Sequence, residues 1–264
     1  MTPRLLTFVA LGQIALSFSG LQTTATRTFD VASIKVNTTG DGGWLLSPPR
    51  RGVEKIVNLE LRKIIASSFR TQDKLILGGP SWIDTTRYNI DAKGADDVTD
   101  VVVWEMMRSL LAERFHLKYH IETREMEVYA LSIARGGHKL GDPAQGLCGA
   151  AIKAGEECGA IKFPPYGVAI DNAPVGALTA VMARRLQNLP VVDDTGLKGR
   201  YDALVRWRPD DMTPEQLDAL PAEARPPDMS MFEAFERQAG LKLEVRKRPT
   251  RVVVIDSIEP AEPN

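Results

Sequence analysis

Two segments of the chain share one pattern of apolar and polar residues. Residues 117–131 and 241–255 each alternate, break at a polar stretch and resume with β-branched residues, and matched positions are 124 apart. Alternation with a period of two is typical of a strand that buries one face. The pattern therefore predicts two equivalent β-hairpins, with Tyr119, Ile121, Leu243 and Val245 facing a shared core.

An amphipathic helix is predicted before each hairpin. Before the second, Ser230 and Glu233 have the spacing of a capping box, and Gly240 marks the end of the helix. Before the first, Asp100 is expected to cap a helix whose apolar residues share one face. That face consists of Val103, Met107, Leu110, Leu111 and Phe115.

A second pair of helices is predicted upstream, after Asn58 and after Asn172. Each is followed by a short apolar strand and then by a strand that opens with Arg-Tyr, at Tyr88 and at Tyr201. These tyrosines are 113 positions apart, 11 fewer than the hairpins. The difference predicts an insertion in the second half, in the Pro-rich residues 209–227. The apolar faces are Leu61, Ile64, Ile65 and Phe69 in one helix, and Leu178, Val181, Met182 and Leu186 in the other.

Together these patterns predict an α+β fold of two β-α-β-β-α-β-β repeats. The sheet is expected to be mostly antiparallel, with helices packed on it. The first repeat covers residues 28–135 and the second covers residues 166–259. Residues 136–165 are expected to form a Gly-rich linker that holds both cysteines, Cys148 and Cys158.

The amino terminus differs from the rest of the chain. Arg4 precedes a short apolar run, and small residues follow at Ser19 and Ala25. This order is typical of a secretory signal peptide, which predicts that residues 1–25 are removed on export to the periplasm or the medium. No later segment is apolar enough to cross a bilayer, so no membrane span is expected in the mature chain.

Composition and cysteine count refine this picture. The 264 residues carry 33 basic and 34 acidic side chains, a balance that gives no support for a nucleic-acid partner. Cys148 and Cys158 are the two cysteines of the chain. An oxidising compartment favours a disulfide between them, and two free thiols are the alternative.

Five ordered motifs resemble an uncharacterised exported family of Acidobacteria of the Solibacter type, a domain of unknown function. The motifs are residues 29–35 (FDVASIK), 79–82 (GPSW) with Tyr88, 110–115 (LLAERF) with His120, 192–193 with 195–202 (TGLKGRYD), and 254–256 (VID). The resemblance implies no catalytic residues. Related domains fused to membrane metallopeptidases of the antibiotic-sensor type imply an extracytoplasmic sensing or binding role.

Catalytic candidates are few. His120 is expected on the polar face of a strand, and its spacing from His116 is too long for one metal ion if both lie on that strand. Asp194, in Asp-Thr-Gly, has the local sequence of an aspartic protease, but the motif occurs once and also suits a turn. We expect no cofactor and no metal, and a hydrolase that uses Asp194 or His120 is the alternative function.

Aromatic residues provide the candidate ligand contacts. Trp82 and Tyr88 flank a Gly-Pro turn, and Trp44 follows a Gly-rich loop. Exposed aromatics at loop tips stack on sugars or peptides, although many fold back over a sheet. The sequence therefore favours a non-enzymatic binding or sensing module of the envelope or secreted fraction. Its expected partner is an envelope protein, a peptide or a glycan, and strand addition at a sheet edge is one route.

Overall fold

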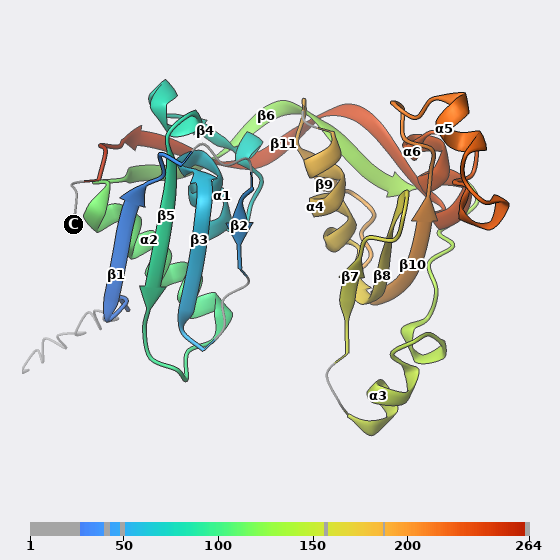
Figure 1. Ribbon diagram of the computed structural model, residues 1–264, viewed down its shortest axis with the longest axis horizontal. Coiled ribbons are helices and arrows are strands. Elements are labelled where there is room, and N and C mark those ends of the chain that lie inside the picture. Colours follow the sequence, from blue (N-terminus) through green and yellow to red (C-terminus); the bar gives the residue numbers. More distant parts are fainter. Residues whose placement is uncertain (1–26, 40–42, 48–50, 156–157, 187, 262–264) are drawn as a thin grey trace, which may run out of the picture.

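The computed structural model describes residues 27–39, 43–47, 51–155, 158–186 and 188–261. The predicted signal peptide lies outside these residues. Within them the chain has an α+β fold with mostly antiparallel sheets, as the sequence predicts; it contains 11 strands and six α-helices. Figure 1 shows two lobes joined across the top by two long strands, β6 and β11.

The first lobe is built on a four-stranded antiparallel sheet in the order β1-β5-β3-β2. Thr99 is the N-cap of α2, so Asp100 is its first helical residue and the predicted Asp100 cap is wrong. The predicted apolar face of α2 is buried against the core. The elements are β1 (Val31–Val36), β2 (Leu45–Leu46), β3 (Val53–Glu60), α1 (Leu61–Ser68), η1 (Asp73–Leu75), β4 (Ile76–Gly78), η2 (Ser81–Asp84), β5 (Arg87–Lys93) and α2 (Asp100–Arg114).

The second lobe has a three-stranded antiparallel sheet in the order β10-β8-β7. The segment expected to be a linker contributes α3 and the edge strand β7, and residues 209–227 contain α5, which Thr213 caps. The elements are η3 (Pro143–Gln145), α3 (Gly149–Ala154), β7 (Ala160–Lys162), β8 (Gly167–Pro174), α4 (Gly176–Arg185), β9 (Val191–Asp193), β10 (Arg200–Arg206), α5 (Pro214–Asp218), η4 (Ala222–Ala224), α6 (Met231–Ala234) and the π-helical turn η5 (Phe235–Ala239).

Each predicted hairpin is in fact one long strand. β6 (Lys118–Ile133) and β11 (Leu241–Ser257) pair with each other in antiparallel fashion over almost their whole lengths. The polar stretches taken for turns lie in the middle of this ribbon, where it crosses between the lobes. Polarity alone suggested those turns, and neither stretch has the glycine of a tight hairpin. Leu243 is buried as expected, but Tyr119, Ile121 and Val245 are exposed, so the predicted core face is wrong for these three residues.

The ribbon belongs to both lobes. β4 adds to β11 and β9 adds to β6, both in parallel, which gives a sheet in the order β4-β11-β6-β9. Val253 and Ile255 of β11 lie in the core of the first lobe. Leu131 of β6 and Leu241 of β11 lie in the core of the second lobe.

The two halves show matching local structure before their first helices. Asn58 and Asn172 both have positive φ, at 55° and 45°. The backbone N–H of Asn58 donates to Oδ1 of Asn89 at 2.8 Å, and that of Asn172 donates to Oδ1 of Asp202 at 2.7 Å. The elements also follow in one order, β3-α1-β4-β5-α2-β6 and β8-α4-β9-β10-α6-β11. The duplication itself stays a prediction, which superposition of the halves would check.

Candidate functional site: a cleft between the lobes

A cavity of about 470 Å³ lies between the two lobes. Residues of β2, β3, α1 and η1 form its wall on the first lobe, and Ala180, Ala183 and Arg184 of α4 form the opposite wall. Figure 1 shows β2 and α4 on the sides of the lobes that face each other. The volume falls within the range of small-molecule binding sites, which makes the cleft a candidate ligand site.

Gln72 connects the two walls. Its amide Nε2 donates to the carbonyl of Val191 at 2.5 Å, and its Oε1 accepts from the N–H of Val191 at 2.8 Å. Val191 opens β9 of the second lobe, and Gln72 precedes η1 of the first. The side chain therefore pairs with the outer edge of β9 as a neighbouring strand would.

Positive charge predominates in the cleft. Lys63, Lys74 and Arg184 line it together with one acidic residue, Asp73. Lys63 Nζ lies 3.1 Å from a carboxylate oxygen of Glu60. No ion pair involves the side chain of Lys74 or Arg184 within the described residues, and both residues are exposed.

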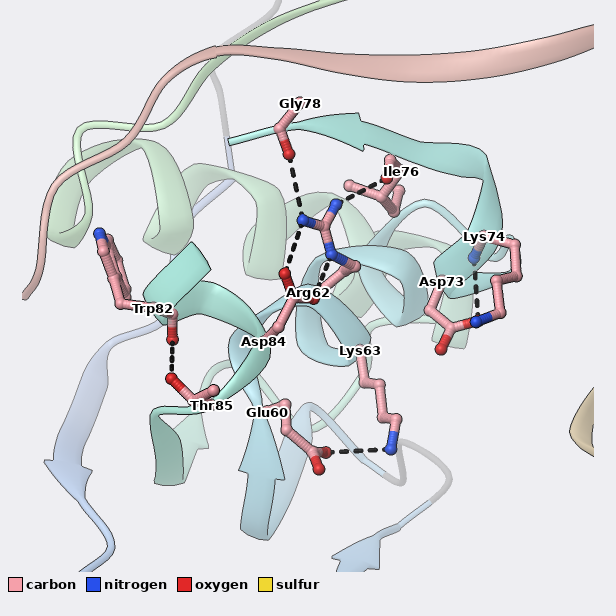
Figure 2. A network of polar contacts seen from close by, with 10 residues as sticks. All are labelled: Glu60, Arg62, Lys63, Asp73, Lys74, Ile76, Gly78, Trp82, Asp84 and Thr85. Atoms are coloured by element: carbon pink, nitrogen blue, oxygen red, sulfur yellow. Dashed lines mark hydrogen bonds and ion pairs between the residues drawn. The ribbon is translucent and has the colours of Figure 1, made fainter. Parts of the chain in front are cut away.

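Arg62 connects α1 to β4 and η2. Figure 2 shows its guanidinium between β4 and η2, where it donates to the carbonyls of Ile76 at 2.7 Å and Gly78 at 3.1 Å and pairs with Asp84. The hydrogen bonds from Arg62 hold the pKa of Asp84 below its usual value. Because Arg62 occupies carbonyls of β4, and Gln72 occupies the edge of β9, both edges of the ribbon sheet already have partners.

The three predicted ligand-contact aromatics do not form one cluster. Trp44 lines the cleft and is 53% exposed. Trp82, on η2, packs against the core of the first lobe. Tyr88 is only 2% exposed, meets Phe115 edge-on, and has its pKa raised by burial. Tyr88 is therefore a core residue, and of the three only Trp44 lies in the cleft.

The two catalytic candidates lie elsewhere. His120 is on the ribbon, with Nδ1 2.8 Å from Asp256 and Nε2 3.7 Å from Glu122. Asp194 forms an ion pair with Arg248. Asp194 lies in the turn that follows β9, where Asp193 accepts hydrogen bonds from the backbone and hydroxyl of Thr195. Neither candidate lines the cleft, and Asp-Thr-Gly takes the turn conformation.

The cysteines form the expected disulfide. Cys148 and Cys158 are bonded, with their Cα atoms 5.6 Å apart. In the part of the chain that the structure describes, no group of three or more His, Cys, Asp and Glu side chains is arranged to hold a metal ion. No helix among the described residues is long and apolar enough to cross a bilayer.

Comparison with known families assigns the chain. The model of a family described as a protein of unknown function, DUF3738, matches residues 62–258. The chain belongs to the DUF3738 family. The match to DUF3738 runs from α1 to the end of β11, so it includes both helices that face the cleft and the whole ribbon. No curated protein and no solved structure matches the chain.

Sequence reasoning missed most of the cleft of this DUF3738 chain. Lys63, Gln72, Lys74 and Arg184 belong to no motif, and they lie on the polar faces or ends of elements whose apolar faces carried the sequence pattern. The helices were found, but which of their polar faces meet across the cleft depends on tertiary structure. The sequence identified Trp44 alone.

Proposed function

We propose that this DUF3738 chain is an exported, non-enzymatic module that binds a ligand in the cleft between its lobes. The observation that carries the proposal is the exposed indole of Trp44 in a cavity of about 470 Å³. Large aromatic side chains are normally buried, so an indole held open to solvent within a concave site is a typical ligand contact.

Three observations support export. The first residues have the order of charged, apolar and small side chains that signal peptides share. The cysteine pair forms a disulfide, which persists in oxidising compartments. The motifs also resemble exported proteins of Acidobacteria. Mass spectrometry of the exported chain should find an amino terminus between residues 20 and 26, and exported material that begins at Met1 would contradict this part of the proposal.

The hydrolase alternative has less support. A general base requires a substrate within hydrogen-bond reach. His120 and Asp194 lie outside the cleft, and their described contacts are carboxylates for His120 and a guanidinium for Asp194. These contacts suit surface ion pairs that stabilise the ribbon and the turn beside it.

A cleft-blocking variant tests the binding proposal. Ala180 is exposed on the α4 wall, so Ala180→Trp places an indole in the cavity. The matched control is Ala112→Trp, on an exposed position of α2 outside the cleft. Glycan and peptide arrays should yield ligands that bind the wild type and Ala112→Trp but not Ala180→Trp. Ligands that bind all three proteins equally, or turnover of an array ligand, would refute the proposal.

A further inference from the structure

We infer that the ligand of the cleft is an acidic saccharide, an oligosaccharide that contains uronic acids. The inference rests on the proposed function and specifies the ligand class of the same site. Three properties of the cleft lead to it: cations on both walls that form no ion pair within the described residues, one exposed indole, and a neighbouring edge strand, β2, of only two residues.

The charge of the cleft selects an anion. Lys74 and Arg184 face the cavity from opposite lobes, and no ion pair occupies either side chain within the described residues. The carboxylate of Asp73 accepts the backbone N–H of Lys74 at 2.9 Å, so it serves the start of η1. Because walls of low dielectric concentrate the field of like charges, the cleft attracts negative ligands. Cations on both walls suit a ligand with several separate carboxylates.

The first-lobe wall of the cleft suits a sugar ring. Trp44 presents a flat apolar face, and Ser67 and Thr71 add hydroxyl groups to the same wall. A pyranose ring has one face of C–H groups, which packs on an indole, and hydroxyls at its rim, which bond to polar side chains. Each uronic acid unit combines these features with one carboxylate.

A peptide fits the cleft less well. Extended peptides bind by adding a strand to a free sheet edge. β2, beside the cleft, has two residues, Leu45 and Leu46. The outer edge of β9 is occupied by Gln72, and carbonyls of β4 are occupied by Arg62. An acidic peptide would therefore meet the cations with only the two-residue edge of β2 to hold its backbone.

Calorimetric titration of the purified full chain tests the inference with three probes. These are trigalacturonate, its fully methyl-esterified form, and triglutamate. Trigalacturonate should bind, and its affinity should fall as salt rises, because screening weakens interactions between exposed charges. The ester keeps the rings but lacks the charges, so it should bind at least about tenfold more weakly.

Variants locate the binding. Arg184→Gln and Lys74→Gln should each weaken trigalacturonate binding about tenfold, because each removes a charge-assisted hydrogen bond. Trp44→Ala should weaken the acid and the ester alike, since stacking does not depend on the carboxylates. Lys198→Gln is the matched control, since it removes an equal charge from an exposed position outside the cleft, and it should leave the affinity unchanged.

Each other outcome overturns the inference. Ala180→Trp and its control Ala112→Trp report separately on the proposed function. Equal binding of acid and ester would exclude recognition of charge. Tighter binding of triglutamate, lost in Arg184→Gln, would identify an acidic peptide as the ligand. If no saccharide binds, the inference fails, whereas an array ligand that only Ala180→Trp excludes would still support a binding cleft.

Discussion

A buried glutamate gives the sharpest test of the structure. Glu54 lies on β3, on the same strand face as the core residue Ile56, and its side chain is 0% exposed. Neither carboxylate oxygen has a hydrogen-bond partner within the described residues. Burial, and secondarily the charge of Asp100, raises the pKa of Glu54 from 4.5 to about 8. The Glu54→Gln variant keeps the shape and removes the titration.

The sign and size of the effect follow from this pKa. The native state keeps the proton up to about pH 8, whereas the unfolded chain releases it near pH 4.5. The free energy of unfolding therefore falls as the pH rises between these values and is level above pH 8. At 1.36 kcal/mol for each pKa unit, the wild type loses about 5 kcal/mol over the whole range and about 3 kcal/mol between pH 5.5 and 8.5.

Urea unfolding followed by circular dichroism measures this loss. The wild type, Glu54→Gln and the control Glu113→Gln, at an exposed position of α2, are compared at pH 5.5 and 8.5 with the disulfide intact. Glu54→Gln should gain about 3 kcal/mol on the wild type between the two pH values, while the control follows the wild type. Parallel curves for the wild type and Glu54→Gln would show that Glu54 is ionised in the native state, and the reasoning would fail.

Three further predictions concern contacts within and between the lobes. Arg62→Ala should lower the free energy of unfolding by about 2–4 kcal/mol, because it removes charge-assisted hydrogen bonds to three partners. A loss below about 1 kcal/mol in urea unfolding would show that these bonds do not stabilise the fold. Gln72→Ala should speed hydrogen exchange at the amide of Val191, and unchanged protection there would rule out the hydrogen bond between Gln72 and Val191. Replacing both Cys148 and Cys158 with serine should lower the free energy of unfolding by about 3 kcal/mol in the same assay, whereas equal stability would show that the disulfide does not stabilise the fold.

Local features of the fold were predictable from the sequence. The spacing of apolar residues located α1, α2 and α4, because each helix buries one face and 3.6 residues per turn leaves a periodic signal. Gly240 ends its helix with φ at 64°, as a helix-terminating glycine does. The disulfide was predictable because Cys148 and Cys158 are close in sequence and are the two cysteines of the chain.

The long strands and the cleft were not predictable in the same way. A polar stretch in a strand resembles a turn until the partner strand is known, and β6 pairs with a strand more than 100 positions later. Within the ribbon, Pro249 lies opposite Glu125, where local propensity alone would end a strand. The cleft combines Trp44, Lys74 and Arg184 from three distant parts of the chain. No local signal connects them.

An exchange of strands makes the two lobes interdependent. β4 belongs to the first half of the chain but pairs with β11 of the second, and β9 of the second half pairs with β6 of the first. The core of the first lobe also contains Val253 and Ile255 of β11. A half of the chain alone would lack these partners and expose unpaired strand edges, so neither lobe is complete without the other. The cleft that Lys74 and Arg184 line therefore lies between two lobes that share the ribbon and the contact of Gln72 with Val191.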